Sequence, residues 1–110
     1  MAVETKSFQN FIDGEWVDAA SGETFDSTSP ATGELIGTFP KSGPEDVDRA
    51  VEAAKRAYEE WRLVPAPARG EILYRFGQLV REHKDSLALL MSREMGKVLP
   101  EAGEIGRAHV

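Results

Sequence analysis

The chain has 110 residues, of which 41% are hydrophobic and 29% are charged, as is ordinary for a globular chain of one-domain size. Its formal net charge of −6 argues against a nucleic-acid binder and against a protein that binds anionic membranes, because both need a basic face. The absence of cysteine excludes a thiol nucleophile and a disulfide framework within these residues, and the absence of a leader or a membrane-length apolar run predicts a cytoplasmic protein with no membrane partner.

The first forty residues are predicted to form short antiparallel strands. Asp13-Gly14 suits the positive φ values of a type I′ turn, so the residues on either side of it should form a hairpin. Phe25 is the one large apolar anchor of a third strand, and a turn over 29–33 leads from it into a fourth. The four predicted strands cover 10–12, 15–17, 24–28 and 34–39.

The rest of the chain is predicted to be helical. Ser42 and Glu45 fit a capping box, in which the serine takes a free amide and the glutamate reaches back. The helix that follows carries apolar residues three and four positions apart, namely Val47, Ala50, Val51, Ala54, Tyr58 and Trp61. Two prolines in the segment 64–67 should end this helix.

Two further helices are predicted, with a new helix start after them. The second helix should run over about 68–83, with one apolar face made of Ile72, Leu73, Phe76, Leu79 and Val80. A short hinge over 84–86 follows, with Asp85 or Ser86 capping a third helix that ends at Gly96. Leu99-Pro100 is a sound initiation signal for another helix, because proline suits the first helical position.

No residue pattern in the chain by itself indicates catalysis. The motif Glu94-Met95-Gly96-Lys97 is most simply explained as a helix C-terminus with a lysine beside its negative end. His83 at a helix end suits a structural or solvated role better than a site. Arg69 in a first helical turn could bind an anion, but an ordinary surface arginine is about as common there. Neither a glycine-rich dinucleotide motif nor a phosphate-binding loop is present.

Several short motifs, in order and at the right spacing, together resemble one family. They are 11–16 (FIDGEW), 29–34 (SPATGE), 45–54 (EDVDRAVEAA), Trp61, 67–69 (PAR) and 94–97 (EMGK). Over about residues 8–103 the chain resembles the N-terminal segment of the NAD(P)-dependent aldehyde dehydrogenase superfamily. Ser29 departs from the asparagine that the family usually shows before this proline, with little expected consequence for a turn.

The resemblance implies an α/β fold: short antiparallel strands followed by three helices, as the first part of a Rossmann-like cofactor domain. It implies oxidation of an aldehyde to an acid by a cysteine thiolate, with hydride transfer to NAD or NADP and a glutamate that activates water. It also implies a homodimer or homotetramer. The catalytic and cofactor-binding residues would all lie beyond position 110, so none is assigned here, and this chain alone is expected to be inactive.

The resemblance further implies a structural monovalent cation near this segment. Many members hold one through main-chain oxygens of the strand before the Pro-Ala-Thr-Gly turn and through a carboxylate before the Gly-Lys pair. The matching positions are Ser27 or Thr28, and Glu94. Oxygen ligands of this kind suit a hard cation.

Residues 1–103 are therefore expected to be an incomplete part of the cofactor-binding domain, and 104–110 a non-native tail. The tail departs from the family's helical pattern, and a DNA string that encodes 105–110 resembles a sequencing adapter. Two alternatives stay open. One is a small non-catalytic α+β interaction protein, and the other is part of an acyl phosphate or acyl thioester reductase of the same superfamily.

Overall fold

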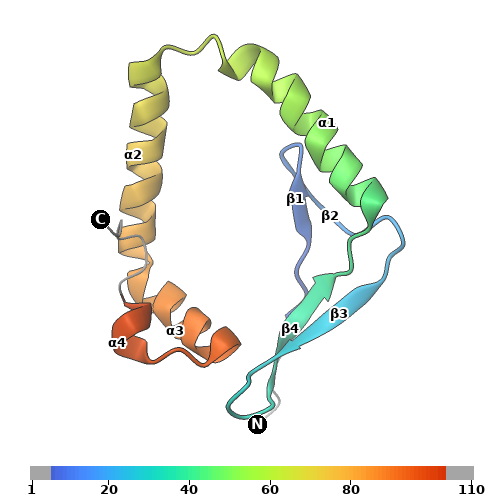
Figure 1. Cartoon of the computed structure of the whole chain (residues 1–110), viewed down its shortest axis with the longest axis vertical. Coiled ribbons are helices and arrows are strands. Elements are labelled where there is room, and N and C mark those ends of the chain that lie inside the picture. The colour runs from blue at the N-terminus through green and yellow to red at the C-terminus, as the bar shows by residue number, and fades with distance from the viewer. Residues whose placement is uncertain (1–5, 104–110) are drawn as a thin grey trace. The chain divides into compact units, whose positions relative to one another are not determined.

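The structure is a computed structural model that describes residues 6–103, in which two hairpins precede a series of helices (Figure 1). These residues divide into two compact units, the first made by 6–28 and 35–63 and the second by 29–34 and 64–103. The elements are β1 (Asn10–Ile12), β2 (Glu15–Val17), β3 (Thr24–Thr28), β4 (Leu35–Pro40), α1 (Pro44–Trp61), α2 (Ala66–Glu82), α3 (Lys84–Met95) and α4 (Leu99–Ala102).

The hairpin of β1 and β2 has the turn that the sequence predicts. Asn10 pairs with Val17 and Ile12 with Glu15, which leaves a two-residue loop. The loop residues Asp13 and Gly14 have φ values of 55° and 75°, as a type I′ turn requires. The predicted hairpin is therefore confirmed.

Strand β3 covers the predicted residues, whereas β4 begins and ends one residue later than predicted and includes Pro40. The two strands pair as an antiparallel hairpin, which the sequence pattern did not establish. The register runs from Thr24 opposite Pro40 to Thr28 opposite Leu35, and it shifts between Ser27 and Thr28. A segment that the sequence does not predict to be a strand lies along the other edge of β4. There the Phe8 amide donates to the Thr38 carbonyl, and the Thr38 amide donates to the Lys6 carbonyl, each at 2.9 Å.

A small aromatic cluster forms on β3 and β4. The Phe8 ring stacks on Phe39 with centroids 4.8 Å apart, and Phe25 lies 5.8 Å from Phe39. Gly37 lies beneath Phe8, and a Cβ atom there would meet the ring at 2.7 Å and the Lys6 carbonyl oxygen at 2.9 Å. This close approach explains why β4 has a glycine within the strand.

Helix α1 begins one position later than the predicted capping box requires. Pro44 takes the first helical position, so Gly43 is the N-cap and Asp46 is the third helical residue. The Asp46 carboxylate accepts the Gly43 amide hydrogen bond at 2.9 Å, which is the role predicted for Glu45. Ser42 instead accepts a hydrogen bond from the Asn10 side-chain amide at 2.7 Å. The prediction of Ser42 and Glu45 as the box was therefore wrong by one residue.

The second unit contains α2, α3 and α4, with α3 in contact with both of the others. Helix α2 starts at Ala66, earlier than predicted, because Pro67 fits within a first turn. The predicted three-residue hinge is wrong, since His83 alone separates α2 from α3. Asp85 and Ser86 lie inside α3 rather than capping it, and the Ser86 hydroxyl donates to the His83 carbonyl at 2.9 Å. Gly96 ends α3 with φ of 74°, as predicted.

Candidate functional site

The predicted cation ligands lie at the ends of two elements. Ser27 is half-buried and Thr28 is exposed, and the register of the β3–β4 ladder shifts between them. Such an irregularity takes a residue out of regular pairing. Glu94 is exposed in the last turn of α3. The two β3 residues belong to the first unit and Glu94 to the second, so the joint site remains a prediction.

Histidine and carboxylate chemistry is sparse along the described stretch. Within residues 6–103, no three histidine, aspartate or glutamate side chains come together as metal ligands. His83 Nδ1 lies 2.9 Å from the Leu79 carbonyl oxygen, one helical turn earlier, as suits the structural role expected of it. The other histidine, His109, lies outside the described residues. Over the same stretch, none of the helices has the length and apolar character needed to cross a membrane.

Asp46 makes the most developed polar arrangement in the first unit. One carboxylate oxygen accepts the Gly43 amide and the other accepts the Ala20 amide, both at 2.9 Å. The hydrogen bonds from Gly43 and then Ala20 stabilise the anion and lower the pKa of Asp46 below its ordinary value. Asp46 is only 4% exposed. It therefore ties the loop after β2 to the start of α1, a structural role that the capping-box pattern signals only in part.

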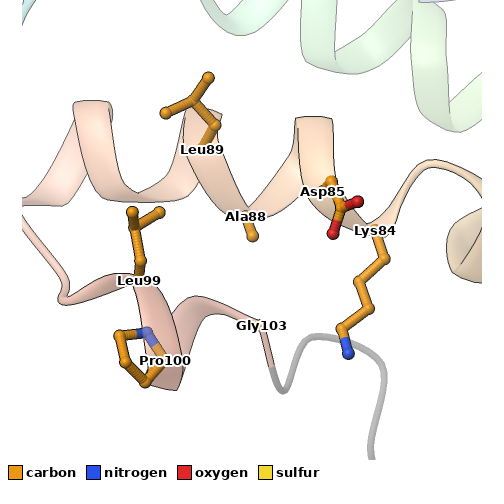
Figure 2. A pocket seen from close by; sticks show the side chains of 7 residues that line it. All are labelled: Lys84, Asp85, Ala88, Leu89, Leu99, Pro100 and Gly103. Atoms are coloured by element: carbon orange, nitrogen blue, oxygen red, sulfur yellow. The ribbon is translucent and has the colours of Figure 1, made fainter.

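A hollow of about 570 Å³ lies between α3 and α4 in the second unit (Figure 2). In Figure 2, Leu89 and Leu99 lie toward one end, and Lys84 and Asp85 lie toward the other. Its lining residues are Lys84, Asp85, Ala88, Leu89, Leu99, Pro100 and Gly103. With one exposed lysine and one exposed aspartate as its ionisable side chains, the hollow holds no pairing of nucleophile and base.

A second hollow, of about 370 Å³, lies between the β1–β2 turn and α1. Its main polar contact is an ion pair of 3.2 Å between Arg56 and Asp13. Both side chains are largely exposed, so solvent screens the pair and it contributes little to stability. The pair joins the β1–β2 turn to α1, and Glu45, Asp48, Arg49 and Glu52 line the same hollow.

The described residues thus form an α/β segment of two hairpins followed by helices. The sequence profile of the aldehyde dehydrogenase family matches residues 16–109, and the chain belongs to this family. The matched range reaches into 104–110, for which a non-native origin is predicted and whose structure lies outside the described residues.

Similar proteins support this assignment in sequence and in structure. Malonate-semialdehyde dehydrogenase 3 of Geobacillus kaustophilus is 50% identical over 105 residues, which is 94% of this chain and 22% of that protein. Succinate-semialdehyde dehydrogenase from Burkholderia pseudomallei superposes with a TM-score of 0.84 at 46% identity, over 87% of this chain and 20% of that one. A 3,6-anhydro-L-galactose dehydrogenase in complex with NAP superposes with a TM-score of 0.87 at 37% identity, over 89% of this chain and 20% of that one. The chain therefore spans about a fifth of the length of these relatives.

Proposed function

We propose that this chain is the N-terminal part of the cofactor-binding domain of an NAD(P)-dependent aldehyde dehydrogenase. The observation that carries the proposal is the 50% identity to a malonate-semialdehyde dehydrogenase across 94% of the chain. Since one of the similar solved structures is a succinate-semialdehyde dehydrogenase, the proposed substrate class is a short aldehyde that also bears a carboxylate. The proposed assembly is a homodimer or homotetramer, and the proposed location is the cytoplasm.

In the proposed reaction a cysteine thiolate adds to the aldehyde carbon and forms a thiohemiacetal. Loss of hydride to NAD+ or NADP+ leaves a thioester, which a water molecule activated by a glutamate hydrolyses to the acid and the free thiol. This chain contains no cysteine and so cannot supply the nucleophile. Its proposed part in the reaction is to complete the fold of the domain that holds the cofactor, and the separate chain is expected to be inactive.

We also propose a structural monovalent cation held by Glu94 and by a main-chain oxygen of Ser27 or Thr28. The register shift between Ser27 and Thr28 supports this proposal, because a residue outside regular pairing can turn its carbonyl toward an ion. The exposed Glu94 carboxylate adds a negative oxygen ligand, which suits a hard cation.

A chimera tests the proposed function. Residues 1–103 replace the matching segment of the Geobacillus kaustophilus enzyme, and the product is assayed for oxidation of malonate semialdehyde with NAD+ and NADP+. We expect activity within about tenfold of the parent enzyme, a loss of about 1.4 kcal/mol at most in transition-state stabilisation. The parent lacking this segment serves as the control. A chimera that folds and assembles but oxidises no aldehyde would contradict the proposal.

Sequencing of the source DNA beyond codon 103 provides an independent test. We expect the reading frame to continue into a chain with a downstream cysteine and glutamate, and residues 104–110 to be absent from that locus. A genome that encodes 105–110 and then a stop codon would favour the non-catalytic interaction protein instead.

A further inference from the structure

The tip of the β1–β2 hairpin presents an aspartate that is followed directly by a glycine. Asp13 and Gly14 form the two-residue loop, and both are exposed. A Cβ atom added to Gly14 would meet nothing within 4 Å, and glycine has no side chain of its own to shield its amide nitrogen. The Asp13 carboxyl carbon therefore has a sterically accessible nitrogen one residue along the chain.

The Gly14 amide also takes no part in the hydrogen bonds of the hairpin. The ladder ends with Ile12 opposite Glu15, on either side of the loop, and the Gly14 amide donates no main-chain hydrogen bond within residues 6–103. Because the nitrogen and the Asp13 carboxyl group belong to adjacent residues, a reaction between them is intramolecular and has no second molecule to bring into place.

Attack of the Gly14 nitrogen on the Asp13 Cγ atom closes a five-membered succinimide ring. The nitrogen forms a bond to Cγ and gives up its proton, the bond from Cγ to one carboxyl oxygen breaks, and one water molecule leaves. Hydrolysis at the main-chain carbonyl carbon of Asp13 takes the water up again and leaves the chain connected through Cγ, as isoaspartate. The net reaction is an isomerisation that consumes no oxidant, reductant or cofactor.

The closed hairpin opposes this reaction. In a type I′ turn the next nitrogen lies on the far side of the Cα–C bond from Cβ, whereas ring closure needs it on the same side. The ion pair of 3.2 Å with Arg56 restrains the Asp13 carboxylate further. The hairpin itself is only marginally stable, since its two strands have three residues each and pair with no other strand among the described residues. Ring closure is therefore expected from a minor, open state of the hairpin.

We propose that Asp13–Gly14 is a modification site at which Asp13 isomerises to isoaspartate, at a rate set by the hairpin and by the ion pair with Arg56. Isoaspartate puts one more carbon atom into the main chain, which a two-residue type I′ loop does not accommodate. It also replaces the side chain that Arg56 binds with a carboxylate attached directly to Cα. The modified hairpin should stay open, and the chain becomes a substrate for enzymes that methylate isoaspartyl carboxylates. The proposal is independent of the proposed function.

The test follows isoaspartate in the full chain, incubated in native buffer and in guanidinium chloride. Peptides from each sample are methylated from S-adenosylmethionine by an isoaspartyl methyltransferase as the probe, and peptide mapping assigns the signal to its position. We expect isoaspartate at Asp13 in both samples, with a native rate about 5–30-fold below the denatured rate, as closure of a marginally stable hairpin implies. Asp13→Glu should remove this signal, because the larger ring closes far more slowly.

Arg56→Gln should raise the native rate about two- to fivefold, as loss of an exposed ion pair allows, and should leave the denatured rate unchanged. Arg62→Gln is the matched control, because Arg62 makes a similarly exposed ion pair of 3.6 Å with Glu59 rather than with the hairpin, and it should change neither rate. Isoaspartate at Asp13 in the denatured chain alone would overturn the site in the folded protein. Equal native and denatured rates would overturn the restraint by the hairpin, and equal native rates in the two arginine variants would overturn the role of Arg56.

Discussion

Gly37 is the position where the structure allows a substitution to be worked through in most detail. In Gly37→Ala, the new Cβ atom would lie 2.7 Å from the Phe8 ring and 2.9 Å from the Lys6 carbonyl oxygen. Real Cβ contacts are almost never this short, and the carbonyl belongs to backbone that is hydrogen-bonded to Thr38, so it cannot simply rotate away. Insertion of a methyl group into a filled site costs about 1–3 kcal/mol.

Glycine loses more backbone entropy on folding than alanine does, so its replacement by alanine partly offsets this cost. Alanine recovers about 0.5–1 kcal/mol on that account, so the net destabilisation should be about 1–2 kcal/mol. The assay is hydrogen exchange of the β3 and β4 amides in the chimera, in which protection should fall by about 5–30-fold.

Gly70→Ala is the matched control for this experiment. Gly70 lies on exposed α2 with no atom within 4 Å of the added Cβ, so the same change should stabilise the helix by up to about 1 kcal/mol. Unchanged or increased protection of β3 and β4 in Gly37→Ala, alongside the expected gain in Gly70→Ala, would refute the reasoning about the contact with Phe8 and Lys6.

Further predictions concern the hydrogen bonds of Asp46, the end of α3 and the proposed cation. Asp46→Asn should speed hydrogen exchange at the Ala20 and Gly43 amides, because both amides donate to the Asp46 carboxylate. Unchanged exchange at these amides would contradict the role of Asp46 in tying the loop after β2 to the start of α1. Because folding lowers the pKa of Asp46, the stabilising contribution of its carboxylate is fully present above the ordinary pKa of 3.8 and is lost as the pH falls through the lower folded-state pKa. The free energy of unfolding of the parent chimera should therefore fall more on acidification than that of the Asp46→Asn variant. Parallel pH profiles of the two proteins would contradict this prediction. Gly96→Ala should cost about 1–2 kcal/mol in thermal denaturation, because φ is 74°, and Gly96→Asn should cost less; equal losses would argue against backbone strain as the cause. Replacement of K+ and Na+ by a bulky organic cation should lower the melting temperature of the chimera but not that of its Glu94→Gln variant, and an ion effect that survives Glu94→Gln would remove Glu94 from the cation site.

Local signals in the sequence suffice for several elements. Asp13-Gly14 can meet the backbone requirement of its hairpin without help from distant residues, and Gly96 does the same at the end of α3. Where two local signals compete, the outcome depends on geometry. Pro44 fixes the start of α1 and thereby moves the capping carboxylate from Glu45 to Asp46, and His83 replaces the predicted hinge because two helices can share one residue as their boundary.

The candidate site was less accessible to sequence reasoning, because its chemistry depends on contacts between distant residues. The assignment of Ser27 or Thr28 together with Glu94 to one cation site comes from the family resemblance, and no pattern within either segment requires it. The Nε of Arg69, unpartnered among the described residues, was likewise not predictable from the sequence, where a first-turn arginine is as often a surface residue as an anion ligand. Burial of that one atom became evident only from the tertiary structure.

The sequence by itself determined the order of the elements, since turn residues and apolar spacing are properties of residues close together in the chain. Its composition excluded a thiol nucleophile within these residues, and the resemblance of its ordered motifs indicated the family. Only the tertiary structure decided that β3 pairs with β4 and in what register, and that a segment ending at Phe8 joins β4 over Gly37. It also decided that Ile72, Leu73, Phe76 and Leu79 on the apolar face of α2 are exposed while Val80 is half-buried, because burial depends on which surfaces the folded chain brings together.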